Sequence, residues 1–514
     1  MLSNELLITS PCVGISGPIN LLEPNEQELK LTNRLESTFE GMNILLSKSE
    51  ICKRREALFD LQTCCNEWVF EKCIMNMHSN IAAKSMTAKL FTFGSYRLGV
   101  DLIDADIDTL LVCPNFITRE EFFDEFYEFL SHNRNVKSLQ CAKDAFVPII
   151  TMKFCDVEMD LLFAQIDEKS VSDDFNLQEN TEKLMRTMDE KDIRSINGVR
   201  VTDDILNLVY NKKTFRLALK IIKLWATRCG IYSNAMGFLG GVSWAILVAR
   251  ICQLWPKGTV YKIVLNFFYI YGNKWKWPTP ILLRNIKKYS SLSLTQWNPE
   301  INENEKFHEM PIITPCYPCQ NSAYNVTCSH KTIIIEHMKQ AHELCQQISK
   351  STRNFSDLFQ PCFFFKYQHY LMVTFKGKIK TEFEKDKSLV ESRLRILAQY
   401  LEKNPHISLV HLNVKKVEGT EIDSLDATDI FFCRWFIGFR KEKMNTNLYI
   451  DKEIEKFEKL VKVKVDISYV KRSDISPYLS DKDKKILNDT TSTLSRKRRN
   501  SDTNSDKNTK KQKV

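Results

Sequence analysis

Two aspartates one residue apart, Asp106 and Asp108, are the residues of this chain whose types and spacing point most directly to chemistry. The residues from Ile107 onward predict an apolar strand, and side chains alternate across a strand, so the two carboxylates share one face. Mg²⁺ in proteins is typically held by one or two carboxylates together with substrate phosphates. The pair therefore indicates metal-assisted transfer of a phosphoryl or nucleotidyl group.

A turn shortly before this pair carries Phe93, Gly94 and Ser95. Successive backbone N–H groups in a tight turn form an anion-binding concavity, and a serine hydroxyl can add one more hydrogen bond. We therefore expect Gly94 and Ser95 to hold phosphate groups close to the two carboxylates.

A third carboxylate is expected from the predicted strand Val157–Phe163. Asp160 has apolar neighbours there, and an unpaired carboxylate is costly among apolar groups, so a cation would explain it. Glu158 has the same parity along the strand, so parity alone does not choose between the two acids. All these acids could instead form a solvated edge of the sheet.

The elements that must position these residues follow from the spacing of apolar side chains. Helical periodicity covers Ile51–Met77, and strands are expected at Leu90–Phe93, Ile107–Cys113 and Phe146–Phe154. Two long buried helices, Phe215–Cys229 and Gly237–Leu254, follow later in the chain. Lys223 lies on the first of these helices, where it either reaches the surface or faces a phosphate.

The C-terminal part changes pattern from Tyr370 onward. Apolar periodicity predicts a strand, a helix, two strands, a helix and a last strand that ends at Lys471. This order is the split βαβ or ferredoxin-like arrangement, which RNA-recognition motifs share. The aromatic signature of those motifs is absent from Arg434–Phe439, so we expect RNA contact through backbone and charge.

Composition sets wider limits. Hydrophobic residues make up 43% of the 514 residues and charged residues 27%, as in ordinary globular proteins. The most apolar stretch, Gly237–Cys252, is shorter than a membrane span, and the first residues resemble no secretory signal. We therefore expect no membrane partner.

The positive charge concentrates at the C-terminal end. Residues 490–514 contain eight Lys and Arg against two Asp, which gives most of the formal charge of +9. The clusters Arg496–Arg499 and Lys510–Lys513 have the form of a bipartite nuclear import signal in a disordered tail. A tail that attracts RNA is the alternative interpretation.

Six segments together resemble the nuclear eukaryotic poly(A) polymerases, within the DNA polymerase β-like nucleotidyltransferase superfamily. In chain order they are Phe91–Val100, Ala105–Asp108, Ile196–Asp203, Ile222–Ala226, Gly237–Trp244 and Met310–Pro315. The resemblance covers about residues 14–475.

The resemblance implies an α+β multidomain fold. A nucleotidyltransferase α/β catalytic domain is expected at 51–165, and a helical middle domain at 14–50 and 166–345. An RNA-recognition-like ferredoxin-fold domain at 346–475 and a disordered basic tail at 476–514 complete the expected organisation.

The resemblance also implies roles for individual residues. Asp106, Asp108 and Asp160 match the catalytic aspartates that bind two Mg²⁺ or Mn²⁺ ions. Residues that match nucleotide contacts are Phe93, Gly94 and Ser95 at the turn, Lys223 and Tyr232 at the triphosphate, and Asn197, Gly241 and Val242 beside adenine.

Two departures from the family pattern bear on nucleotide affinity. The turn Asp101–Asp104 replaces a glycine-containing turn, and Thr227 stands where a second lysine is common. The additional carboxylates could tighten metal binding or repel the triphosphate. Reduced affinity for ATP is the working hypothesis.

The function implied is template-independent addition of AMP from ATP to the 3′-hydroxyl of pre-mRNA. Expected partners are the RNA 3′ end, ATP, the cleavage and polyadenylation complex and a nuclear import receptor, for a nuclear monomer. Two alternatives remain open. One is a terminal nucleotidyltransferase with another base or small-RNA specificity, and the other is an inactive RNA-binding scaffold.

Overall fold

The computed structural model describes residues 15–76, 79–360, 363–422, 429–443, 448–481 and 484. These residues form two compact units. The first takes in the described residues up to Trp225, Leu239–Tyr324 and Met338–Leu358. The second takes in Ala226–Phe238, Asn325–His337 and the described residues from Phe359 onward.

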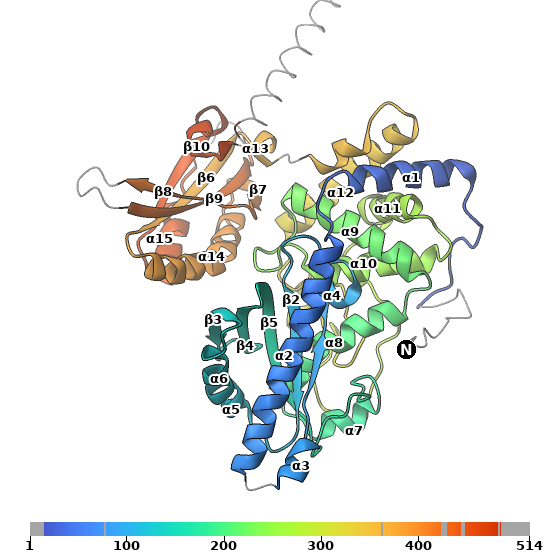
Figure 1. The fold of residues 1–514 in the computed structure, drawn as a ribbon. Helices are drawn as coiled ribbons and strands as arrows, with labels where there is room; N and C mark the ends of the chain where they lie inside the picture. The colour runs from blue at the N-terminus through green and yellow to red at the C-terminus, as the bar shows by residue number, and fades with distance from the viewer. Residues whose placement is uncertain are drawn as a thin grey trace, which may run out of the picture. The chain divides into compact units, whose positions relative to one another are not determined.

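The first unit is built on a five-stranded sheet with the strand order β1-β2-β5-β4-β3 (Figure 1). Its strands are β1 (Lys89–Thr92), β2 (Ile107–Cys113), β3 (Val136–Ala142), β4 (Ile149–Phe154) and β5 (Val157–Gln165). β2 and β5 pair in parallel and all other pairs are antiparallel. The central parallel pair therefore comes from strands that are distant in sequence.

Both faces of this sheet are buried, and successive residues of β2 point to opposite faces. Ile107 and Leu111 belong to a core with Trp68 and Phe126, whereas Leu110 packs on the other face. The first face is covered by α2 (Lys48–Met75), the π-helical turn η1 (Phe122–Phe126) and α6 (Tyr127–Ser131), and α5 (Arg119–Glu121) leads into η1. The second face is covered by α8 (Glu190–Asn207).

The remaining helices of the first unit include α1 (Glu26–Glu40), α3 (Asn80–Lys84), α4 (Gly94–Leu98), α7 (Thr181–Arg186), α10 (Gly241–Leu254) and α11 (Val260–Tyr269). α3 contacts α2, and α4 contacts chiefly β2 and α8. α11 contacts both α1 and α10. α9 (Lys212–Cys229) and α12 (Cys328–Ser349) contribute residues to both units. None of the described helices is both long and apolar enough to span a membrane.

The second unit contains a sheet ordered β10-β6-β9-β7, with β8 paired to β9. Its strands are β6 (His369–Gly377), β7 (Ile407–Leu412), β8 (Val417–Ile422), β9 (Asp429–Lys441) and β10 (Asp466–Lys471). α14 (Lys380–Glu402) contacts α15 (Asp451–Val461), β6 and β7. Apart from β8, this is the predicted order of strands and helices.

Candidate active site

The two strands that carry the predicted aspartates lie side by side. β2 and β5 are parallel, and the register makes Asp108 and Asp160 direct partners. Neighbouring strands are about 4.8 Å apart, so these two side chains leave the sheet next to each other. Asp106 directly precedes β2 and is exposed. The sheet thus brings the three predicted carboxylates to one place.

Burial and neighbouring negative charges raise the pKa values of two of these carboxylates. Burial, followed by the charges of Asp106 and Asp160, raises the pKa of Asp108 to about 7. Burial also raises the pKa of Asp160, although a hydrogen bond from Thr151 opposes the shift. The site therefore concentrates negative charge that no neighbouring cation fully compensates.

A divalent cation fits this donor set, because carboxylate oxygens are the ligands that Mg²⁺ and Mn²⁺ prefer. Among the described residues, however, no group of three or more His, Cys, Asp or Glu side chains is already arranged to hold a metal ion. The aspartate side chains would have to draw together around an incoming cation.

The predicted phosphate turn lies against Asp108. Gly94 has φ +58°, and a Cβ there would lie 2.0 Å from Asp108 Oδ2, so only glycine fits. The backbone N–H of Phe93 donates to the Asp108 carbonyl at 3.0 Å. The N–H of Gly94 donates to the Thr202 hydroxyl at 3.2 Å, and Ser95 is half-buried one residue later. The turn is therefore fixed from both β2 and α8.

Lys223 reaches the same region from α9. Its Nζ donates to the Val100 carbonyl at 3.4 Å. Burial lowers its pKa, and Asp101, Asp106 and Asp108 partly oppose this shift through their negative charge. The ammonium group thus lies close enough to the carboxylates to interact with them electrostatically.

The unusual turn Asp101–Asp104 is held by a cation from α2. Arg54 NH2 donates to the Ala105 carbonyl at 2.5 Å, and Arg54 NH1 lies 3.7 Å from the Asp101 carboxylate. Both side chains of this ion pair are largely buried. The charge of Asp101 is therefore partly neutralised within the protein.

The residues predicted beside adenine come from α8 and α10. Arg200 NH1 donates to the Asn197 side-chain oxygen at 3.4 Å, and the Phe93 ring packs on Gly198. Gly241 and Val242 form the first turn of α10, where Val242 is 38% exposed despite its apolar side chain. α4, which begins at Gly94, contacts both α8 and α10, so these two helices lie next to the Gly94 turn.

Tyr232 is the one predicted residue that belongs to the second unit, where its side chain is half-buried. The sequence reasoning also missed Arg54 and Thr202 as supports of the site. Thr202 falls inside the segment Ile196–Asp203 and could have been suspected there. Arg54 carries no sequence signal, because an arginine on an amphipathic helix is ordinarily a surface residue.

Comparison with known proteins identifies the family. Three family descriptions match in succession: "Poly(A) polymerase nucleotidyltransferase domain" at residues 14–209, "Poly(A) polymerase central domain" at 214–361 and "Poly(A) polymerase predicted RNA binding domain" at 362–426. These matches confirm the predicted fold class. The boundaries of the predicted domains remain predictions.

Curated relatives agree with this match. The chain is 41% identical to the poly(A) polymerase pla1 of Schizosaccharomyces pombe over 77% of its length and 70% of that protein. It is 39% identical to the poly(A) polymerase PAPa of Candida albicans over 79% of its length and 73% of that protein. The Dictyostelium discoideum poly(A) polymerase is 35% identical over 91% of this chain, which spans 59% of that relative's length.

Among solved structures, that of the Cid1 poly(U) polymerase aligns with 66% of this chain and 100% of its own, at 15% identity and a TM-score of 0.43. The matched domains and the curated relatives show that the chain belongs to the poly(A) polymerase family.

Proposed function

We propose that this chain adds AMP from ATP to the 3′-hydroxyl of RNA without a template. The observation that carries this proposal is the pairing of Asp108 with Asp160 beside the Gly94 turn. The three matched poly(A) polymerase domains and the relatives named poly(A) polymerase support it.

The reaction is an in-line displacement at phosphorus. The 3′-oxygen of the RNA attacks the α-phosphate of ATP, the bond to the β-phosphate breaks and pyrophosphate leaves. The hydroxyl proton passes to solvent. Rate enhancement in such reactions comes mainly from positioning and from stabilising charge.

Asp106, Asp108 and Asp160 would hold the divalent cations, which we propose are two Mg²⁺ or Mn²⁺ ions. When bound, these ions would acidify the attacking hydroxyl and neutralise charge on the phosphates. The phosphates would lie against Gly94 and Ser95.

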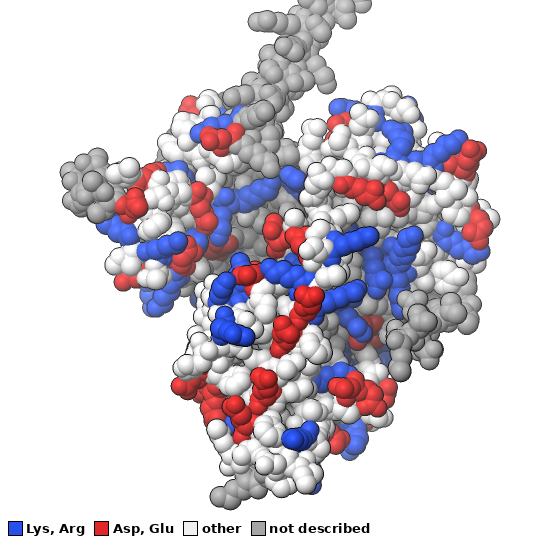
Figure 2. Space-filling model, viewed as in Figure 1, with Lys and Arg blue, Asp and Glu red and all other residues white. Residues whose placement is uncertain are grey.

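A row of cations on α9 supports phosphate binding at this site. Arg216, Lys220 and Lys223 recur at helical spacing and therefore share one face of α9. Arg216 Nε donates to the Leu98 carbonyl at 3.0 Å, and Lys223 reaches Val100, so this face meets the chain that follows α4. Figure 2 shows several Lys and Arg side chains in the region where Figure 1 draws α2 and α9. This face would attract the triphosphate and the RNA strand.

Selectivity for adenine would come from Asn197, Gly241 and Val242. Because the Asn197 oxygen accepts from Arg200, its amide N–H₂ remains the group that can donate to a base.

The cellular setting is also part of the proposal. The basic clusters Arg496–Arg499 and Lys510–Lys513 support import into the nucleus by a receptor. We propose that the chain acts there as a monomer recruited by the cleavage and polyadenylation complex. Both clusters lie outside the described residues.

Extension of a 3′-hydroxyl RNA primer with each of the four nucleotides separately tests the proposed function. We expect elongation with ATP and little with the other three nucleotides. Preferred use of UTP would instead indicate a terminal nucleotidyltransferase of other specificity. The variant Asp108→Ala is the control, and if wild type and variant were equally inert while both bound RNA, the scaffold alternative would replace this proposal.

A further inference from the structure

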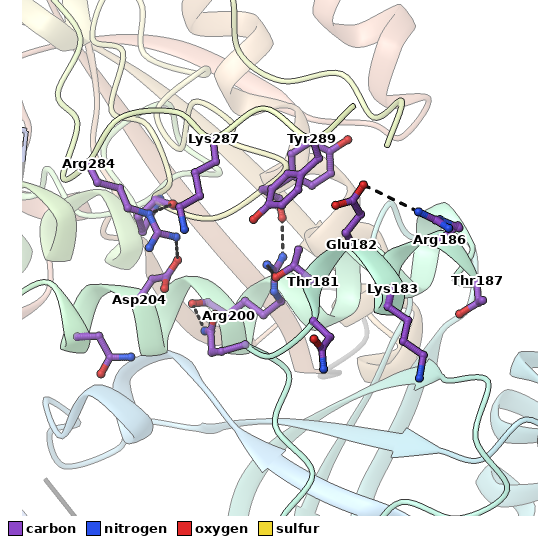
Figure 3. A pocket seen from close by; sticks show the side chains of 15 residues that line it. Thr181, Glu182, Lys183, Arg186, Thr187, Arg200, Asp204, Arg284, Lys287 and Tyr289 are labelled. Carbon is purple, nitrogen blue, oxygen red and sulfur yellow. Dashed lines mark hydrogen bonds and ion pairs between the residues drawn. The ribbon is translucent and has the colours of Figure 1, made fainter. Parts of the chain in front are cut away.

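A cavity of about 760 Å³ opens in the first unit, away from the residues that are predicted to bind ATP. It lies between α7, the C-terminal half of α8 and the segments 284–289 and 315–317 (Figure 3). The described residues that line it include none of those predicted to bind the nucleotide or metal. This cavity therefore has its own set of side chains.

The lining is strongly cationic. Its charged members are Lys183, Arg186, Arg200, Arg284 and Lys287 against Glu182 and Asp204. Arg284 pairs with Asp204, and Arg186 lies 3.9 Å from Glu182. Among the described residues, Lys183, Lys287 and Arg200 form no ion pair. The cavity therefore has an excess of positive charge that an anionic ligand could neutralise.

Arg200 forms a fixed part of this surface. The side chain is 3% exposed, NH1 donates to the Tyr317 carbonyl at 2.5 Å and NH2 donates to the Thr181 hydroxyl at 3.0 Å. Its Nε has no hydrogen-bond partner among the described residues. Arg200 is therefore held within the cavity wall, where it adds positive charge just beneath the surface.

Aromatic rings lie beside these cations. Tyr289 and Tyr317 both line the cavity, and their rings meet edge to face at 5.1 Å. Figure 3 shows Tyr289 above Arg200 and next to Lys287. Tyr317 is buried and Tyr289 is half-buried, so part of the Tyr289 ring faces the cavity. Cations suit a phosphate and an aromatic ring suits a base or ribose, so together they match a nucleotide better than an isolated anion.

We propose that this cavity binds a nucleotide phosphate, with Lys183 and Lys287 on the phosphate, Arg200 in the cavity wall and Tyr289 beside the base or ribose. The nucleotide is either free in solution or one residue of an RNA strand. The proposal concerns binding alone, so it stands or falls independently of the nucleotide that the active site transfers.

The test uses the full chain with Lys183→Ala/Lys287→Ala. Both lysines are exposed at the cavity, and neither belongs to the proposed active site. The control is Lys306→Ala/Lys339→Ala, which removes the same charge from exposed positions that do not line the cavity. Arg200 is left unchanged because it also contacts Asn197.

Two probes distinguish the sources, both at about 150 mM salt to screen long-range attraction. For a free nucleotide, titration calorimetry with AMP gives one fewer bound molecule per chain in the cavity variant than in wild type and control. For RNA, a fluorescent oligo(A) that lacks a 3′-hydroxyl binds the cavity variant at least about tenfold more weakly than the control. The KM for ATP at saturating primer stays the same in all three proteins. Equal binding of both probes to the two variants would overturn the proposal.

Discussion

At the scale of single residues, the proposed phosphate-binding role of Gly94 depends on its backbone conformation. Its positive φ and its contact with Asp108 exclude a side chain, so Gly94→Ala should move the turn away from the carboxylate. We expect kcat/KM for ATP to fall by about 100-fold or more, as for loss of one well-placed transition-state contact. Steady-state kinetics on an RNA primer measures this.

Gly17→Ala is the matched control, because nothing lies within 4 Å of a Cβ at that position. The melting temperatures of the two variants show whether folding is affected. An unchanged kcat/KM in Gly94→Ala would contradict the proposed phosphate-binding role of the turn.

Residue types and spacing were enough to propose which carboxylates form the site, but not how those carboxylates pair across the sheet. Alternation along one strand predicted that Asp106 and Asp108 share one face, although β2 begins only at Ile107. It could not choose between Asp160 and Glu158, because the register between β2 and β5 depends on packing across many intervening residues. In the structure Asp160 pairs with Asp108, whereas Glu158 is exposed and lies 3.7 Å from Lys153.

At the scale of elements, buried histidines of the second unit should make its stability depend on pH. Burial lowers the pKa of His330 to about 4 and that of His337 to about 3, and it also lowers that of His411. The charged and titratable groups that act on them are Lys366, Glu336, Arg395 and Tyr367.

These histidines stay neutral in the folded chain but take up protons near pH 6.5 when it unfolds. Their contribution to stability is therefore complete above pH 6.5 and is lost as the pH falls toward 4, by about 1.4 kcal/mol per pH unit for each histidine. We expect hydrogen exchange in β6 and β9, corrected for intrinsic rates, to accelerate between pH 7 and pH 5.

The variant His337→Leu removes one of these groups and should make the pH dependence shallower. The comparison uses the same peptides from both proteins at each pH. Identical slopes for wild type and variant would show that His337 does not resist protonation in the folded state.

Elements with a strong apolar pattern agreed closely with the sequence prediction, and exposed ones did not. The predicted strand Ile107–Cys113 coincides with β2, since six of its seven residues are buried. β3 and β8 were missed because their residues are mostly exposed and carry no apolar alternation. α10 begins at Gly241 rather than Gly237, where φ is +89° and the backbone is not helical.

At the scale of the whole molecule, the candidate functional residues are distributed over the two units. The first unit carries the carboxylates and the Gly94 turn, and the second carries the ferredoxin-like sheet and Tyr232. Sequence periodicity predicted this sheet because its strands and helices alternate locally. The cavity beside α7 could not be predicted, because it depends on how segments 284–289 and 315–317 approach α8.

Removal of the basic tail should abolish nuclear accumulation and leave the catalytic activity largely intact. A chain that ends at residue 489 loses both basic clusters, which lie outside the described residues. We expect nuclear accumulation of a fluorescent fusion to be lost, while primer extension in vitro changes by less than about threefold, since only long-range attraction for RNA is weakened. Continued nuclear accumulation would contradict the import role.

Asp160, in register with Asp108, is expected to complete the carboxylate site for adenylyl transfer. Incorporation of a single AMP into an RNA primer under single-turnover conditions measures this role, with Asp160→Asn compared with Glu158→Gln on the same strand. We expect the rate to fall by about 10³-fold or more for Asp160→Asn and by less than about threefold for Glu158→Gln. Equal rates for the two variants, or a greater loss for Glu158→Gln, would contradict it.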